Sequence, residues 1–305
     1  MIEASHISKQ FGPIHALQDV NFSLPKGEIL AIMGANGAGK STLFDILATL
    51  DTRFEGELRM MGLDARSGQR AIRQNSGYLP GRFSLYADLT VQENLDFFAS
   101  VYARSVTHIY GHPIWEGLRP FANRPAGLLS GGMKQKLSLC CALVHQPGLL
   151  FLDEPTTGID PRSRHELWQA LQSLQASGTT IIASTHYLDE LLYTNHILFL
   201  HNGLQLAFDT PAGLLAGFTK QLASVSGYPA FQLNQVLQLM PDSESCYLFG
   251  DSVRMVFGSQ FSRHLLVDYC ARKGFEKAEI SWVSPSMEDV FMDKLLWNTS
   301  SAALC

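Results

Sequence analysis

The chain has 305 residues, of which 46% are hydrophobic and 17% are charged, and its formal net charge is −5. This composition predicts a well-packed globular protein with one large or two ordinary domains. The negative charge excludes a bulk attraction to nucleic acid, although not a local basic patch, and the longest apolar run, residues 137–144, is too short to span a bilayer.

Two segments near the N-terminus, residues 2–8 and 20–24, alternate apolar and polar residues as strands of a partly exposed antiparallel sheet do. The turn between them carries Phe11, which could be a buried loop anchor or a ring on which a purine stacks. No basic segment followed by an apolar stretch opens the chain, so we expect no secretory signal.

A glycine-rich loop, Gly-Ala-Asn-Gly-Ala-Gly-Lys-Ser, spans residues 34–41. The pattern is typical of phosphate loops, whose backbone N–H groups approach phosphates closely because no Cβ obstructs them. A buried strand at residues 28–33 and a helix at residues 40–50 would flank it, so that phosphates meet the positive end of the helix. We therefore predict nucleoside triphosphate binding by Gly34, Asn36, Gly37, Gly39, Lys40, Ser41 and Thr42.

Two of these side chains have specific tasks. Lys40 would place its charge on the β- and γ-phosphates, and the Ser41 hydroxyl would ligate Mg²⁺. After this helix we expect a strand at residues 56–60, a polar stretch to residue 75 and a short strand at residues 76–80.

A helical region follows. Thr90-Val-Gln-Glu93 is a capping box, which predicts a helix over residues 91–102. Residues 103–127 contain scattered Gly, Pro and aromatic residues, which indicates short helices and loops. We predict a helical subdomain at about residues 88–147.

Ser130, Gly131 and Gly132 precede a helix that we expect to reach residue 144. They have the features of a second anion site, with a hydroxyl, free N–H groups and the helix dipole. A plain N-cap is the alternative, but it would need only the serine.

Residues 148–152 form an apolar run that ends at Asp153 and Glu154. The carboxyl end of a buried parallel strand is where open α/β sheets bind ligands, so we expect both acids beside the phosphate loop. Asp153 suits Mg²⁺, directly or through water, and Glu154 suits polarisation of an attacking water. Acids at a strand end are also common in loops, but the upstream phosphate loop favours catalysis.

Asp160-Pro161 predicts the start of a helix that runs to residue 176, and a buried strand follows at residues 179–184. His186 comes directly after it and could reach a γ-phosphate, or could be structural. Asn202-Gly203 joins strands at residues 197–200 and 204–208, as in a type I′ hairpin.

The composition changes near residue 212, and we predict an accessory domain at residues 213–305 after a first domain at residues 1–212. We expect a weakly helical segment at 214–235, a hairpin at 246–257, a helix at 261–273, a strand at 278–283, and a final helix to about residue 297, capped by Ser284-Pro285. This small α+β appendix carries no recognisable catalytic constellation.

Five cysteines form no C-x-x-C pair, which suits free thiols in a reducing cytosol. They are Cys140, Cys141, Cys246, Cys270 and Cys305. The first two fall in an apolar helical pattern, so we expect them to pack in a core.

Over about residues 2–212 these motifs together resemble the ATP-binding subunit of ABC transporters. The resemblance implies an α/β fold, a P-loop ABC ATPase with a mixed core sheet, an antiparallel β subdomain and a helical subdomain. Residues 34–41 match the Walker A loop, residues 149–154 match Walker B with Glu154 as the catalytic glutamate, and residues 129–135 match the signature motif, which binds ATP held by an opposing subunit. The remaining matches are Phe11 to the adenine-stacking aromatic, residues 157–161 with Asp160 to the D-loop, and His186 to the switch histidine.

Gly81 departs from the family pattern, in which a glutamine at this place touches Mg²⁺ and the attacking water. Glycine supplies no side-chain ligand, so water or a neighbour such as Arg82 or Ser84 would have to substitute. The closing motif at residues 284–291 resembles that of multidrug and antibiotic exporter ATPases whose permease is a separate polypeptide.

The sequence thus predicts the ATP-hydrolysing subunit of an ABC exporter, with ATP and Mg²⁺ as cofactors. Lys40, Glu154 and His186 would be catalytic, and Ser41 and Asp153 would hold the metal. Two copies would close head to tail around two ATP molecules and drive integral-membrane permease subunits from the cytoplasmic face of the membrane. Both sites are complete apart from Gly81, which favours a homodimer over a heterodimer.

Two other functions stay open. A soluble ABC ATPase could act on ribosomes, DNA or cofactor assembly, although this chain has one cassette and no sustained heptads. A regulatory subunit with weak hydrolysis is the other, because Gly81 removes a side chain from the site. The transported substrate leaves no trace in this sequence, since it would contact the permease.

Overall fold

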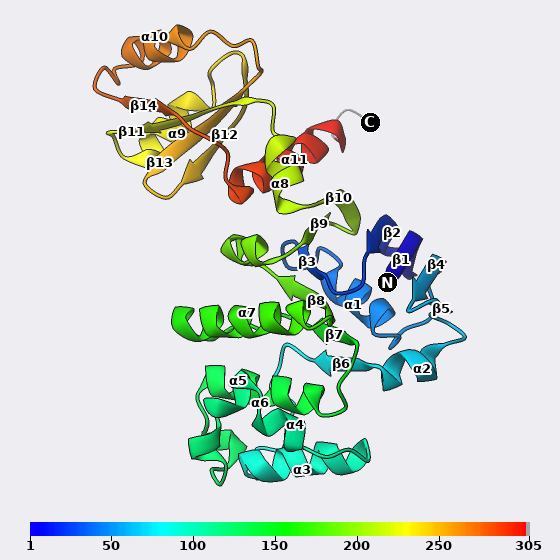
Figure 1. Ribbon diagram of the computed structural model, residues 1–305. Helices are drawn as coiled ribbons and strands as arrows, with labels where there is room; N and C mark the ends of the chain where they lie inside the picture. Colours follow the sequence, from blue (N-terminus) through cyan, green and yellow to red (C-terminus); the bar gives the residue numbers. More distant parts are fainter. Residues whose placement is uncertain (303–305) are drawn as a thin grey trace. The chain divides into compact units, whose positions relative to one another are not determined.

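The computed structural model describes residues 1–302, and for residues 297–302 it describes the backbone alone. The chain forms two compact units, Met1–Pro211 and Ala212–Cys305 (Figure 1).

Within the described residues, a ten-stranded sheet runs through the first unit in the order β5-β4-β1-β2-β10-β9-β3-β8-β7-β6 (Figure 1). Strands β6, β7, β8, β3 and β9 pair in parallel, whereas β1, β2, β4 and β5 pair antiparallel. β10 joins the two regions, because it lies antiparallel to β9 and parallel to β2. The bounds are β1 (Ile2–Phe11), β2 (Ile14–Leu24), β3 (Ile29–Met33), β4 (Glu55–Met60), β5 (Leu63–Asp64), β6 (Ser76–Leu79), β7 (Leu149–Leu152), β8 (Thr180–Thr185), β9 (His196–His201) and β10 (Leu204–Asp209).

The central parallel strands β3, β7 and β8 are buried on both faces because helices cover each side. Every residue of β3, β7 and β8 is buried. Leu30 and Ile32 pack in one cluster with helix α1 (Lys40–Leu47), whereas Ile29 packs in another with α7 (Pro161–Ala176). This alternation is that of a buried parallel strand, and it confirms the predicted α/β fold.

The helical subdomain is built from short elements. They are α3 (Val91–Val101), α4 (Thr107–Tyr110), α5 (Pro113–Glu116), the 3₁₀ turns η1 (Arg119–Phe121) and η2 (Ala126–Leu128), and α6 (Gly131–Leu143). The capping box is confirmed: the Thr90 hydroxyl accepts from the Glu93 N–H at 3.2 Å, and the Glu93 carboxylate accepts from the Thr90 N–H at 2.8 Å.

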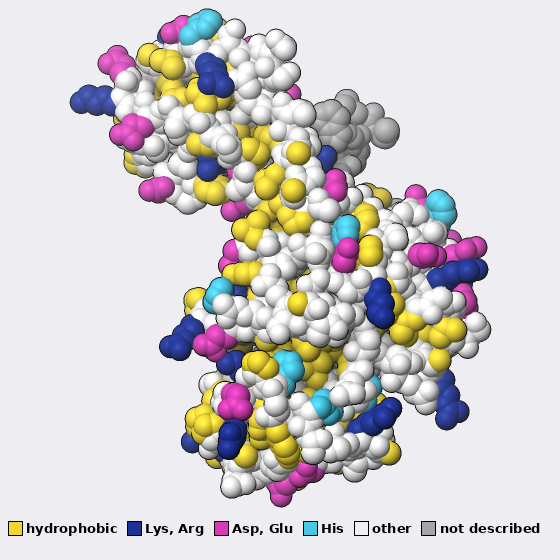
Figure 2. Space-filling model, viewed as in Figure 1, with side chains coloured by type: hydrophobic (Ala, Val, Ile, Leu, Met, Phe, Trp, Pro, Cys, Tyr) yellow, Lys and Arg dark blue, Asp and Glu magenta, His cyan; other side chains and the backbone are white. Residues whose placement is uncertain are grey.

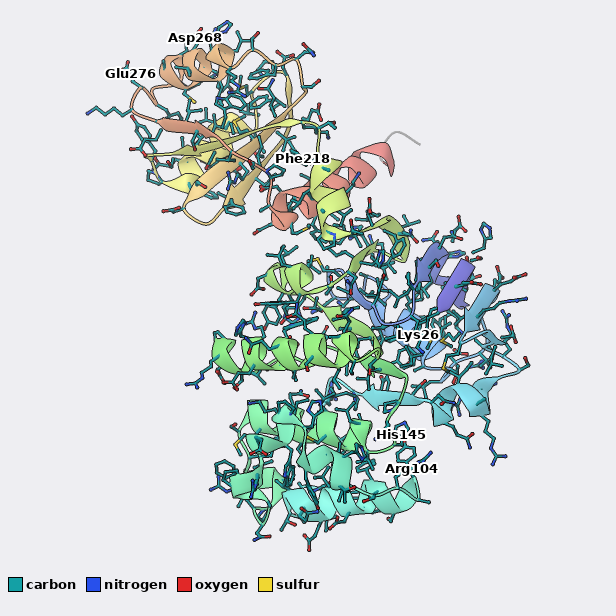
Figure 3. The ribbon with its side chains drawn as sticks, viewed as in Figure 1. Lys26, Arg104, His145, Phe218, Asp268 and Glu276 are labelled. Atoms are coloured by element: carbon teal, nitrogen blue, oxygen red, sulfur yellow. The ribbon has the colours of Figure 1, made fainter. Side chains whose placement is uncertain are left out.

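His145, between α6 and β7, joins this subdomain to the sheet. Its ring stacks on Tyr102 with the centroids 4.0 Å apart, and its Nε2 lies 3.0 Å from the Ser76 carbonyl oxygen. Figure 3 shows Arg104 in the same region, where its charge joins burial in lowering the pKa of His145. The residue after α3, strand β6 and the α6–β7 link are thus joined by the contacts of one side chain, that of His145.

The second unit has the element order β-α-β-β-α-β, and within its described residues a four-stranded sheet has the order β12-β13-β11-β14, as in ferredoxin-like domains. Helices α9 and α10 pack on one face against Val225, Val253 and Phe257. Met292 of α11 packs on the other face. The bounds are α8 (Pro211–Ala216), β11 (Gln221–Ser226), α9 (Ala230–Leu237), β12 (Ser243–Phe249), β13 (Ser252–Phe257), α10 (His264–Arg272), β14 (Glu279–Trp282) and α11 (Met287–Ala302).

Two predictions for this unit were wrong. The weakly helical segment at 214–235 contains strand β11, which β13 and β14 pair on both sides; this tertiary pairing overrides weak local preference. The final helix is capped by Ser286 rather than Ser284, because Ser286 and Asp289 exchange hydrogen bonds in a capping box.

Smaller differences occur in the first unit. The polar stretch before residue 75 contains β5 and helix α2 (Gln69–Gln74), and α1 ends at Leu47 rather than residue 50. The first strand extends to Phe11, so this ring lies at a strand end and not in the turn.

Cys140, Cys141, Cys246 and Cys270 are free, as predicted, and Cys305 lies outside the described residues. Burial raises the pKa of Cys140 to about 12, as expected for a packing residue.

Candidate functional site

The phosphate loop lies between β3 and α1, and neighbouring backbone packs tightly against it. A Cβ on Gly39, whose φ is +103°, would lie 2.5 Å from the Ala16 carbonyl oxygen of β2. A Cβ on Gly34 would collide with the Leu200 carbonyl oxygen of β9. These two glycines therefore have a packing role within the protein, in addition to the close phosphate approach predicted from the sequence.

Lys40 begins helix α1, and its side chain is only 6% exposed. Its ammonium donates hydrogen bonds to the carbonyl oxygens of Gly34 and Ala35, at 2.8 and 3.2 Å. The Glu154 Oε1 atom lies 3.8 Å away. A buried cation thus stands at the centre of the loop.

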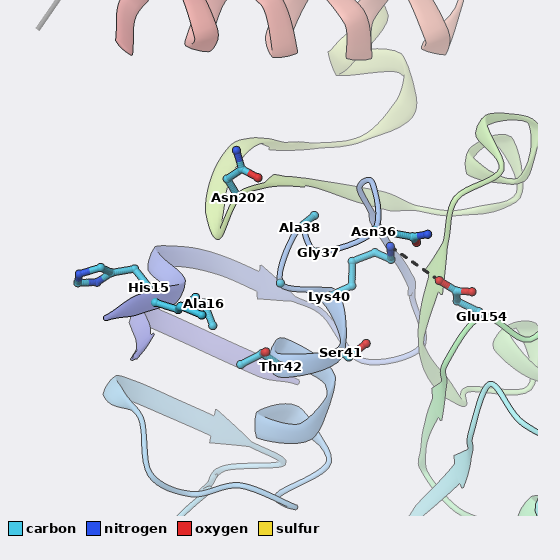
Figure 4. Close-up of a pocket in the computed structure, with 12 residues that line it drawn as sticks. His15, Ala16, Asn36, Gly37, Ala38, Lys40, Ser41, Thr42, Glu154 and Asn202 are labelled. Atoms are coloured by element: carbon cyan, nitrogen blue, oxygen red, sulfur yellow. Dashed lines mark ion pairs between the residues drawn. The ribbon is translucent and has the colours of Figure 1, made fainter. Parts of the chain in front are cut away.

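A cavity of about 390 Å³ opens over this loop (Figure 4). Its lining includes six of the predicted nucleotide-binding residues together with the predicted catalytic Glu154; the six are Asn36, Gly37, Gly39, Lys40, Ser41 and Thr42. Ile14, His15 and Ala16 at the start of β2 and Asn202 of the β9–β10 turn also line it, and sequence reasoning missed them. Asn202 and Gly203 both have positive φ, which confirms the type I′ turn that brings Asn202 there.

Phe11 is 50% exposed and is not among the residues that line this cavity. The Lys9 ammonium lies 4.8 Å from the centroid of its ring. Ile14, which does line the cavity, pairs with Phe11 across the β1–β2 hairpin. The Phe11 ring therefore does not line the cavity itself, but its cross-strand partner Ile14 does.

Glu154 follows β7 and is surrounded by residues from distant parts of the chain. Besides Lys40, the Thr157 hydroxyl donates to Glu154 Oε2 at 3.1 Å, and His186 Nδ1 lies 3.7 Å from the same oxygen. Glu154 has a φ of +45°, a conformation that non-glycine residues seldom adopt. The fold thus brings together the three residues predicted to be catalytic.

Ser184 of β8 contacts both acids, and sequence reasoning missed it. Its hydroxyl donates to Asp153 Oδ1 at 2.6 Å and accepts from the Glu154 N–H at 2.8 Å. Because β8 lies between β3 and β7, a hydroxyl on it can reach the residues that end β7.

Negative charge accumulates at Asp153. Burial raises the pKa of Asp45 on α1, and the carboxylates of Asp153 and Asp51 raise it further. Burial, Asp153 and Asp45 raise the pKa of Tyr78 to about 12. The Asp153 carboxylate and the Ser41 hydroxyl, which lines the cavity, are hard oxygen donors of the kind that Mg²⁺ takes.

The signature residues lie apart from this cavity. Ser130 caps α6, with its hydroxyl accepting from the Met133 N–H at 3.3 Å, and none of Ser130, Gly131 and Gly132 lines the cavity. A Cβ on Gly132 would lie 2.6 Å from the hydroxyl oxygen of Ser163 on α7. Helix packing therefore accounts for Gly132, apart from any role in a second anion site.

Asp160 caps α7. Its carboxylate accepts a hydrogen bond from the Ser163 N–H at 3.0 Å, and this contact is the main cause that lowers its pKa. Asp160 is exposed and does not line the cavity either. Asp160, the D-loop candidate, and Ser130, the signature candidate, therefore cap α7 and α6, whose N-terminal ends lie next to each other.

Gly81 lies against Asp153, since a Cβ on it would be 3.0 Å from the Asp153 carbonyl oxygen. Arg82 and Ser84 are exposed, and neither lines the cavity over the phosphate loop. No side chain from residues 81–84 replaces the glutamine in this cavity.

Comparison with known proteins gives concordant matches. The family model described as "ABC transporter" matches residues 17–157. The chain is 38% identical to the probable multidrug ABC transporter ATP-binding protein YbhF of Escherichia coli over 71% of this chain, but spans only 38% of that relative's length. It is 36% identical to the Nod factor export ATP-binding protein I of Burkholderia lata, over 70% of this chain and 72% of that protein.

Solved structures agree with these relatives. An ATP-binding subunit of an ABC transporter matches 72% of this chain and 93% of its own, with a TM-score of 0.64 and 31% identity. The ATP-binding cassette MJ0796, described as a dimeric post-hydrolysis state bound to ADP and Pi, matches 69% of this chain and 98% of its own, with a TM-score of 0.60 and 27% identity.

Proposed function

Because this chain belongs to the ABC transporter family of ATP-binding cassettes, we propose that it is the ATP-hydrolysing subunit of an exporter with a separate membrane permease. The observation that carries the proposal is that Lys40 and Glu154 both line the phosphate-loop cavity, while His186, which does not line it, has its Nδ1 3.7 Å from Glu154 Oε2. Relatives named for multidrug transport, Nod factor export and linearmycin resistance support the export direction.

The chemistry follows from these residues. Lys40 and the loop N–H groups hold the β- and γ-phosphates, and Glu154 orients and polarises the water that attacks the γ-phosphate in line. His186 stabilises the charge that develops on the transferred group. When bound, Mg²⁺ offsets phosphate charge, and the Ser41 hydroxyl and the Asp153 carboxylate would hold it.

The active assembly is a head-to-tail dimer, and we favour a homodimer. Ser130–Gly132 do not line the cavity of their own chain, so a second copy supplies them to complete the site. The dimeric state described for MJ0796 supports this arrangement.

The protein works on the cytoplasmic face of the membrane, where permease subunits recruit it. Among the described residues, no helix combines the length and apolar character that a bilayer crossing requires. We expect no nucleic-acid partner. On the face shown in Figure 2, Lys and Arg side chains stand apart and are mixed with Asp and Glu, without a continuous basic surface.

Replacement of Glu154 by Gln tests this function. The amide cannot polarise water as a carboxylate does, so phosphate release should fall by at least about a hundredfold while ATP binding persists. The variant should accumulate as an ATP-bound dimer on size-exclusion chromatography. Thr157→Ala is the control, because it removes only a hydrogen bond to Glu154 and should therefore lower phosphate release less than E154Q does. Undiminished phosphate release by E154Q would refute the assigned role.

A regulatory subunit with weak hydrolysis is the second candidate, and Gly81 favours it. The cavity receives no side chain from residues 81–84, so the water would be held less firmly. ATP turnover measured with and without the co-purified permease separates the two functions. An exporter ATPase should be stimulated by its permease, whereas a regulatory subunit should stay slow in both conditions, and a soluble ATPase should capture no permease.

A further inference from the structure

We propose that Ser184 is a positioning residue that sets the geometry of Asp153 and Glu154 together. The inference rests on the proposed function, because it concerns the two acids assigned there to the metal and to the attacking water. Ser184 is buried and does not line the cavity, so it acts through its two neighbours.

The contacts of its hydroxyl define a single arrangement. A serine hydroxyl has one proton and two lone pairs. Because the Asp153 carboxylate can only accept, the proton goes to Asp153 Oδ1, at 2.6 Å. A lone pair then accepts the Glu154 N–H, at 2.8 Å. Ser184 is fully buried, so water does not compete for either contact.

Each contact has a consequence for the site. The bond to Oδ1 fixes the rotation of the Asp153 carboxylate and leaves Oδ2 available as a metal ligand. The bond to the Glu154 N–H supports a backbone with φ of +45°, which is strained for a residue that has a Cβ. That backbone conformation directs the Glu154 side chain toward Lys40 and His186, at 3.8 and 3.7 Å.

Thr185, the next residue on β8, also carries a hydroxyl, but that hydroxyl has a different task. Thr185 donates to Glu190 at 2.5 Å and accepts from the Tyr187 N–H at 3.0 Å, so it organises the loop that carries His186. Successive residues of a strand face opposite sides. Ser184 thus serves the acids that follow β7, whereas Thr185 serves the segment after β8.

Ser184→Ala removes both contacts at once. Loss of a group that orients a metal ligand typically costs about 10–100-fold in metal affinity. We expect the gain in ATP affinity on adding Mg²⁺ to shrink by about tenfold or more in calorimetric titrations. ATP affinity in EDTA should stay within about twofold of the original chain, because the phosphate loop is untouched, and kcat should fall more than KM changes.

Two further variants separate positioning from stability. Ser184→Thr keeps the hydroxyl and should retain most of the metal-dependent gain and most of kcat. Thr180→Val is the matched control, because Thr180 is buried on the same strand and its hydroxyl accepts the Gly27 N–H at 2.9 Å. It lies four residues from Ser184, about 13 Å along the strand, so it should lower the melting temperature without changing the metal-dependent gain.

The inference fails if Ser184→Ala keeps both the full gain in ATP affinity on adding Mg²⁺ and the original kcat. It also fails if Thr180→Val loses that gain and kcat to the same extent as Ser184→Ala. If Ser184→Ala does not fold, the Ser184→Thr result decides, since a loss there in a folded protein also contradicts the proposal. E154Q measured in parallel distinguishes the two failures. If E154Q hydrolyses ATP slowly while Ser184→Ala keeps its metal-dependent gain and kcat, only the inference is overturned. If E154Q hydrolyses ATP as fast as the original chain, the proposed function is overturned.

Discussion

At the scale of single residues, the site depends on a few side chains that other residues constrain. Lys40 is a buried cation whose hydrogen bonds go to two loop carbonyls and whose nearest carboxylate is that of Glu154. Its ammonium is therefore available to an anion that enters the cavity. Ser184 and Gly81 constrain the acid side of the same site from within the fold.

Replacing Lys40 with Ala should abolish measurable ATP binding, because the phosphates lose the one side-chain cation that lines the described cavity. Isothermal titration with ATP is the measurement. Lys26→Ala is the matched control, since Lys26 (labelled in Figure 3) is exposed and does not line the cavity, and this variant should bind ATP normally. Unchanged affinity in Lys40→Ala would contradict the role of this lysine.

Gly81 allows a second prediction at this scale. A Cβ would stand 3.0 Å from the Asp153 carbonyl oxygen, so Gly81→Ala should displace the backbone of Asp153 and lower kcat by about tenfold. Gly148→Ala is the control, because a Cβ there meets nothing within 4 Å. Gly81→Gln adds a side-chain amide at this position. Turnover above that of the original chain in Gly81→Gln would show that the missing amide, and not the close packing, limits the site.

At the scale of elements, short links between helices and strands decide how the site is held. His145 contacts Tyr102 after α3 and the Ser76 carbonyl of β6, so it connects the helical subdomain with the sheet. Because Nε2 must carry the proton that it donates to Ser76, Nδ1 is unprotonated, and this buried atom has no hydrogen-bond partner.

This arrangement predicts a pH dependence of stability. Burial is the main cause that lowers the pKa of His145 in the folded chain, and the charge of Arg104 adds to it. Neutral His145 therefore stabilises the fold fully above the unfolded-state pKa of about 6.5, and this contribution is lost as pH falls through the lower folded-state pKa. His145→Phe keeps the stacking but loses the hydrogen bond, at a cost of about 1 kcal/mol at pH 8.

The difference in the free energy of unfolding between the original chain and His145→Phe should shrink from pH 8 to pH 5. Urea unfolding at both pH values measures it, and other titrating groups cancel in the difference. A gap that widens toward pH 5 would show that protonated His145 is stabilised in the fold, contrary to this prediction.

At the scale of the whole molecule, the cavity of one cassette lacks the signature residues. Ser130 begins α6, whereas the loop and the acids meet at the carboxyl ends of β3 and β7. In the proposed homodimer a partner completes each site, so hydrolysis would be a property of a symmetric assembly with two equivalent sites.

Mixing two inactive variants tests this arrangement. Lys40→Ala breaks the phosphate loop and Ser130→Phe obstructs the signature, so each alone should be nearly inactive. In a mixture, half of the dimers pair one chain of each kind and contain one intact site, so about a quarter of the original activity should return. Ser130→Phe should stay folded, because this exposed cap contributes only about 1 kcal/mol. No recovery on mixing would exclude the shared site.

The sequence by itself was sufficient for the fold class, for most elements and for the loop residues and Glu154 that the structure places around one cavity. This was possible because burial periodicity, glycine spacing and capping are local signals, as the confirmed capping box at Thr90 and the type I′ turn at Asn202 illustrate. The family resemblance then gave these local signals a common meaning.

The tertiary structure alone decided the contacts between segments far apart in the chain. Strand β11 forms because β13 and β14 pair with it on both sides, although its own sequence is weakly patterned. Ser184 reaches both acids because β8 lies between β3 and β7, and Gly132 must be small because Ser163 packs on it. Such contacts join residues far apart in the chain, 30 positions in the case of Glu154 and Ser184, and local periodicity contains no information about them.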